Sequence, residues 1–150
     1  METIEIKIER TDVYDEVEKS TDYTGAKLIE TDSGARDRML ASNSDLETMN
    51  RFWVEAGHVV NERFKDMLLT GNVGATSYSA TLEVSVAFDK VLTPSVEKSV
   101  RSFFIAFILG EWFKFAKKDE VRDYNETAGE FLTNAERLLY SRRGPKVPAN

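Results

Sequence analysis

The chain has 150 residues, of which 41% are hydrophobic and 31% charged, and its net charge is -6. This length and composition predict one ordinary globular domain, and the negative charge argues against a protein that coats DNA or an anionic membrane by bulk electrostatics. The absence of cysteine excludes disulfides, thiolate nucleophiles and cysteine metal sites.

The sequence shows neither the pattern of a signal peptide nor that of a membrane span. The opening residues, METIEIKIER, do not have the pattern of a signal peptide. No stretch reaches the roughly 18 uninterrupted apolar residues of a membrane span. We therefore expect a protein that is made and kept in a cytoplasm.

Residues 3–9 alternate between isoleucines on one face and charged side chains on the other, which predicts a half-buried strand. The period then changes to that of a helix, with Thr11 as its cap and Gly25 as its end or as a kink. The polar segment after it predicts a turn at Ser33–Gly34 and a short helical turn over residues 35–40.

The next helix is predicted over residues 45–69. Ser44 and Glu47 have the spacing of a capping box, a stripe of apolar residues recurs at helical spacing, and Gly71 closes the helix.

Alternation returns over residues 77–88, and it predicts a long strand with an apolar face. Only the strand at residues 3–9 is available to pair with it, and a two-stranded ribbon is marginal in water. We therefore expect this strand to pack on the helices or to find further strands in a neighbouring subunit.

The segment SVRSFFIAFILGEWFKFAKK belongs to a helix over residues 94–116 that begins at Thr93–Pro94. Its apolar residues lie on opposite sides of the helical wheel, so the helix has to be buried from two directions. Gly110 would let another helix approach closely.

A last amphipathic helix, over residues 119–140, can cover one side of the 94–116 helix, and the 45–69 helix can cover part of the other. The sequence thus predicts an α+β fold with one domain over residues 1–140, made of about four helices and a small antiparallel β-element. Residues 141–150 form an extended basic tail that contains Arg142, Arg143 and Lys146.

The sequence carries no catalytic, cofactor or metal signature. His58 falls on the polar face of its helix, and GNVGATS lacks the lysine of a phosphate loop and leads into a strand. Glu111, inside the apolar helix, has two interpretations: a catalytic acid with a raised pKa, or an ion-pair partner of Lys114 or Lys118. Arg63 is expected to form a structural salt bridge, within or between subunits.

Four blocks of the sequence resemble small proteins encoded by tailed phages and prophages of gut bacteria: VYDEVEKSTDYTGAKL, LETMNRFWVEAGHVVNERFKDML, SVRSFFIAFILGEWFKFA and AERLLYSRR. The likeness covers most of the chain. It implies a virion structural protein near the portal, such as a head-to-tail connector or neck-ring subunit, and such proteins are typically helical bundles whose β-element joins neighbours in a ring. They have no catalytic residues to carry over.

The resemblance implies a homo-oligomeric ring in the virion neck, assembled in the host cytoplasm, with portal and tail proteins as partners and no cofactor. DNA would pass through the ring without sequence-specific binding. The alternatives are a tail-completion or tail-terminator protein, or a monomeric cytosolic binding module; an enzyme is a more distant alternative. The candidate interface residues are Tyr78, Leu82, Val84, Val86, Ile105, Leu109, Trp112, Arg142, Arg143 and Lys146.

Overall fold

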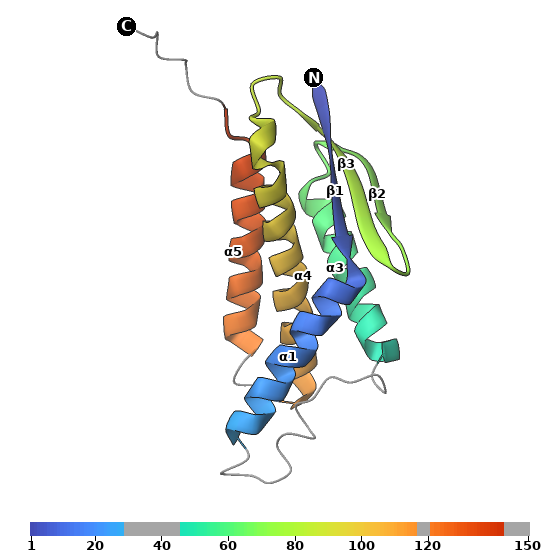
Figure 1. Ribbon diagram of the computed structural model, residues 1–150, viewed down its shortest axis with the longest axis vertical. Coiled ribbons are helices and arrows are strands. Elements are labelled where there is room, and N and C mark those ends of the chain that lie inside the picture. The colour runs from blue at the N-terminus through green and yellow to red at the C-terminus, as the bar shows by residue number, and fades with distance from the viewer. Residues whose placement is uncertain (29–45, 117–120, 143–150) are drawn as a thin grey trace, which may run out of the picture.

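The computed structural model of the chain describes residues 1–28, 46–116 and 121–142, with only the backbone at residues 22–28 and 115–116 (Figure 1). The predicted turn at Ser33–Gly34, the helical turn over residues 35–40 and the Ser44 half of the capping box lie outside the described residues. The same is true of Arg143 and Lys146 in the tail.

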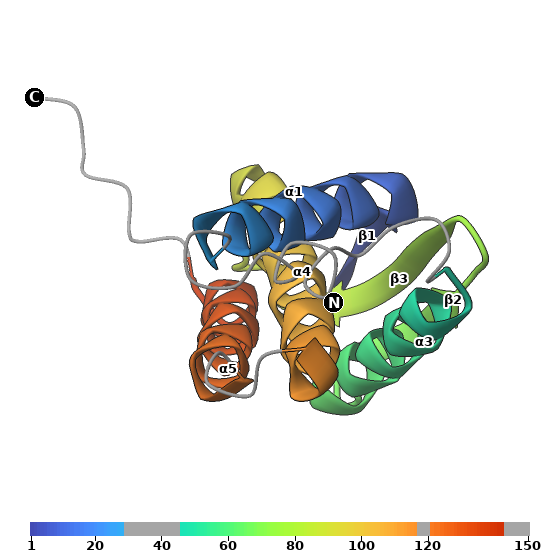
Figure 2. The same ribbon diagram turned by 90° about the horizontal axis from the view of Figure 1, so that it is seen from below.

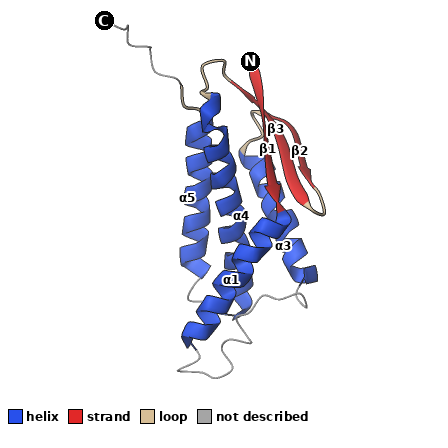
Figure 3. Cartoon of the chain, in the orientation of Figure 1, coloured by secondary structure: helices blue, strands red, loops and turns tan. Residues whose placement is uncertain are grey.

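Three antiparallel strands form one sheet in the order β1-β3-β2, namely β1 (Glu2–Glu9), β2 (Leu68–Val73) and β3 (Ser77–Val84) (Figure 3). The strand predicted at residues 3–9 is confirmed, and Ile4, Ile6 and Ile8 face the core because side chains alternate along a strand. In the register of the first pair, Glu2 lies opposite Val84 and Glu9 opposite Ser77.

The strand β2 corrects two expectations. The helix predicted over residues 45–69 ends at Arg63, and Leu68–Val73, with Gly71 inside it, pairs with β3. The two leucines continue the apolar helical stripe in sequence, but their backbone is in the sheet. As a result β3 is the central strand, and the expectation that residues 3–9 are its only partner within the chain is wrong.

The helices cover one face of the sheet and extend beyond it, as Figures 1 and 2 show. They are α1 (Arg10–Leu28), α3 (Leu46–Arg63), the short 3-10 turn η2 (Lys90–Leu92), α4 (Thr93–Ala116) and α5 (Val121–Leu139). The predicted α+β fold, four helices with an antiparallel sheet, is confirmed. Two details of α1 differ: it begins directly after β1, before Thr11, and it continues through Gly25.

The helix α4 is the centre of the core, and the chain itself covers most of its surface. On the sheet side, the Phe104 ring lies 4.7 Å from that of Trp53 on α3 and 5.4 Å from that of Tyr78 on β3, measured between centroids. On the α5 side, a Cβ atom at Gly110 would lie 2.9 Å from the Asn125 side chain, so the predicted close helix approach at Gly110 is confirmed.

A polar connection ties α3 to the sheet. The hydroxyl of the fully buried Tyr78 donates a 2.7 Å hydrogen bond to Asn61 Oδ1, and Asn61 Nδ2 donates to the Gly71 carbonyl oxygen at 3.3 Å. A Cβ atom on residue 71 would lie 2.2 Å from Asn61 Oδ1. This close approach explains why glycine occupies a strand position.

Candidate functional site

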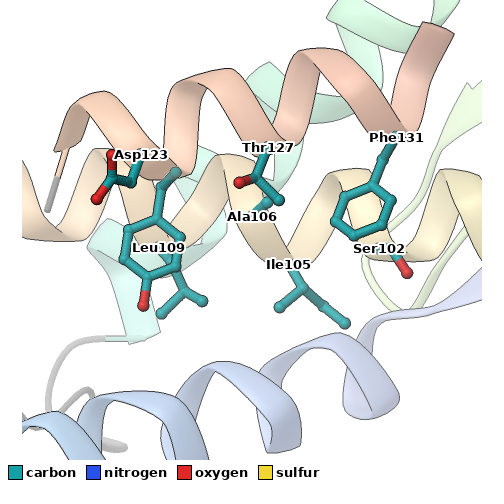
Figure 4. Close-up of a pocket in the computed structure, with 8 residues that line it drawn as sticks. Ser102, Ile105, Ala106, Leu109, Asp123, Thr127 and Phe131 are labelled. Carbon is teal, nitrogen blue, oxygen red and sulfur yellow. The ribbon is translucent and has the colours of Figure 1, made fainter.

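A mainly apolar groove lies between α4 and α5, with a volume of about 390 Å³ (Figure 4). A volume of this size lies within the range of pockets that hold ligands or partner side chains. The groove is lined by Ser102, Ile105, Ala106, Leu109, Asp123, Tyr124, Thr127 and Phe131.

The groove exists because the neighbours of α4 leave one side of that helix open. The sheet, α3, α5 and α1 all contact α4, and in Figure 2 α1 and α5 lie on adjacent sides of it. Ile105 lines the groove and points from α4 toward α1 in Figure 4. The two-sided burial predicted for this helix is therefore nearly complete within one chain.

Three of the candidate interface residues belong to this open side of α4. Ile105 and Trp112 are half-buried, and Leu109 is 3% exposed but still lines the groove. Ile105 and Leu109 line the groove and Trp112 does not, and the groove is the candidate functional site.

The helix α5 supplies the aromatic wall and the charge. Tyr124 stacks on Phe113 of α4, with ring centroids 5.4 Å apart and planes 17° from parallel, so its ring is held in place. Phe131 is half-buried and sits two turns further along α5. Among the described residues of the lining, Asp123 is the only charged one, and Thr127 contributes a hydroxyl. The groove can bind an apolar segment that carries a cation.

The strand candidates occupy a different place. Tyr78, Leu82 and Val84 are at most 3% exposed, because they lie on the inner face of the central strand. They hold the domain together and offer nothing to a neighbour. Val86 lies beyond the end of β3 and is 59% exposed.

The helix α5 ends at the end of the domain where the N-terminus also lies (Figure 1). Arg142 Nη1 donates a hydrogen bond to the Ser85 hydroxyl, which attaches the start of the tail to the loop after β3. Met1 and Tyr140, exposed by 78% and 58%, line a small cavity of about 150 Å³ at this end, together with Arg142. Exposed apolar side chains therefore also surround the point where the tail begins.

The remaining candidates have structural roles. Glu111 forms a 2.7 Å ion pair with Lys114, which agrees with the second of the two interpretations of that residue. Arg63 pairs with Glu136 at 2.8 Å and donates to the Thr133 hydroxyl at 3.0 Å, so the expected salt bridge joins α3 to α5 within the chain. His58 is exposed on α3.

Comparisons of the chain with protein-family models, with curated proteins and with solved structures find no match. Within the described ranges, no group of three or more acidic or histidine side chains could hold a metal ion, and no helix is long and apolar enough to cross a membrane. Sequence reasoning had identified the apolar residues of α4 but had missed the α5 side of the groove. The spacing of Asp123, Thr127 and Phe131 on one helix face was the available signal.

Proposed function

We propose that the chain is a structural subunit of a tailed-phage virion, of the head-to-tail connector or neck-ring type. The likeness of the four sequence blocks to phage proteins supports this proposal. The observation that carries it is the apolar groove on α4, because a helix side left open beside an otherwise complete core is suited to binding another protein chain.

The mechanism would be mechanical. Copies of the domain would form a ring through contacts between a groove and a neighbouring chain, and the exposed apolar side chains at the tail end would contact the portal or tail protein. The negative net charge suits a channel through which DNA slides without sticking.

The test is the mass of the purified protein by light scattering after size exclusion, alone and with the portal protein of the same phage. We expect an oligomer in at least one of the two samples. Ile105→Glu should abolish it, because a carboxylate in the groove cannot be desolvated cheaply. Val59→Glu is the matched control, since Val59 is 38% exposed on α3. A 17.0 kDa monomer in both samples would contradict the proposal and favour a monomeric binding module.

A further inference from the structure

The tail contains a recognition pattern that its charge alone does not describe. Residues 142–148 read RRGPKVP, in which Arg142, Pro145 and Pro148 are spaced at intervals of three. Proline-rich segments of this P-x-x-P type adopt the polyproline II helix at a low entropy cost and dock into grooves lined by aromatic rings.

The groove between α4 and α5 has the matching features. Tyr124 and Phe131 both line it from α5, and seven residues of helix separate them by about 10.5 Å along the axis. Pro145 and Pro148 are separated by about 9.3 Å in a polyproline II helix. Each proline of the pattern can therefore meet one aromatic ring.

The charges agree as well. Asp123 is the only charged side chain among the described residues that line the groove, whereas Arg142, Arg143 and Lys146 are cations and residues 141–150 contain no acidic side chain. When Pro145 and Pro148 contact the two aromatic rings, Lys146 between them can pair with the Asp123 carboxylate.

We propose that the C-terminal segment Arg143–Pro148 of one copy docks into the groove of a neighbouring copy, with Lys146 at Asp123. The segment cannot make this contact within its own chain. Asp123 lies about 24 Å along α5 from Leu139, whereas four residues from Arg142, which is attached to Ser85, span at most about 14 Å.

Such a contact joins two different surfaces and is therefore head-to-tail. Contacts of this kind close into a ring when the rotation between copies permits and otherwise continue as a filament. The inference deepens the proposed function, and it rests on that function for the closed ring.

The first experiment measures binding of a dye-labelled SRRGPKVPAN peptide to the full-length chain by fluorescence anisotropy. The full-length chain carries Pro145→Ala and Pro148→Ala, the changes expected to weaken tail binding most, so that its own tail competes little with the peptide. We expect saturable binding, and we expect at least a tenfold loss when the peptide carries Pro145→Ala and Pro148→Ala. Ile105→Glu in the chain should abolish binding, and Val59→Glu should leave it unchanged. Equal binding of the two peptides, or binding that survives Ile105→Glu, overturns the inference.

A charge exchange tests the partner of Lys146. Lys146→Glu in the peptide and Asp123→Lys in the chain should each weaken binding by about two- to fivefold, as expected for an exposed ion pair. Combining the two changes should restore it. Asp123→Asn is a milder second variant, and thermal melting checks that each chain is folded. A combination no tighter than either single change overturns the pairing.

The two proposals fail in different ways. An oligomer that forms while the peptide does not bind overturns the tail inference and leaves the connector function standing. Saturable peptide binding by a chain that stays monomeric with its portal protein supports the contact and overturns the connector function.

Discussion

The connection between Asn61, Gly71 and Tyr78 supports a quantitative prediction about Gly71→Ala. The new Cβ would lie 2.2 Å from Asn61 Oδ1, so the amide must move by more than 1 Å, since ordinary contacts begin at 3.4 Å. The buried Tyr78 hydroxyl then loses its acceptor, which costs about 1–3 kcal/mol, and the bond to the Gly71 carbonyl contributes about 1 kcal/mol more. Alanine also restricts the unfolded chain, which stabilises the folded state by about 0.4–1 kcal/mol. We expect a net loss of about 1–3 kcal/mol.

The assay is a double-mutant cycle in urea with Asn61→Ala as the second change. Without the Asn61 amide the Cβ has room, so in that background Gly71→Ala should be neutral or stabilising by up to about 1 kcal/mol. A change of sign between the two backgrounds is the signature of a steric conflict with Asn61. If Gly71→Ala costs the same in both backgrounds, its effect arises from the strand backbone, and the reasoning from this contact is refuted.

Four further predictions concern two helix glycines, an ion pair and the Tyr78 hydroxyl. Gly129→Ala should stabilise the chain by about 0.5–1 kcal/mol in urea unfolding, because a Cβ there meets no atom within 4 Å and alanine is the better helix former. Gly110→Leu should destabilise the chain by about 1–3 kcal/mol or more in the same assay, because the larger side chain overpacks the contact between α4 and α5. A mutant cycle of Arg63→Ala with Glu136→Ala should give a coupling of at most about 1 kcal/mol, reduced in 1 M salt, because both side chains are about one-third exposed. Burial raises the pKa of Tyr78 above its usual value of 10.0, so the folded state holds the phenol proton more tightly than the unfolded state. The free energy of unfolding should therefore fall as the pH rises above about 10, and Tyr78→Phe should flatten that slope.

The sequence predicted those parts of the fold in which local pattern and final environment agree. Isoleucines at positions 4, 6 and 8 alternate because one face of β1 meets the helices. The apolar residues on opposite sides of α4 predicted burial from two directions because helices lie on both sides of it. In each case the spacing of apolar residues follows directly from the geometry of a single element.

The strand β2 shows why local pattern can fail. LLTGNV carries two leucines that continue a helical stripe, and glycine is a common helix end. Its strand conformation depends on pairing with β3 and on the room that Gly71 leaves for Asn61, and neither is visible in the segment itself. The groove could not be predicted for a similar reason, because its position depends on which side of α4 the packing of α1 and α5 leaves open.

The pairing of β1 with β3 has a consequence for how the chain folds as it is synthesised. Glu9 finds its partner at Ser77 and Glu2 at Val84, so the first strand is made long before the central strand that completes it. At about 5–20 residues per second, β1 waits about 4–15 s for residue 84 to be added. During that time Ile4, Ile6 and Ile8 have no sheet to cover them. The charged side chains between them, Glu5 and Lys7, act as gatekeepers that oppose association of nascent chains through this strand.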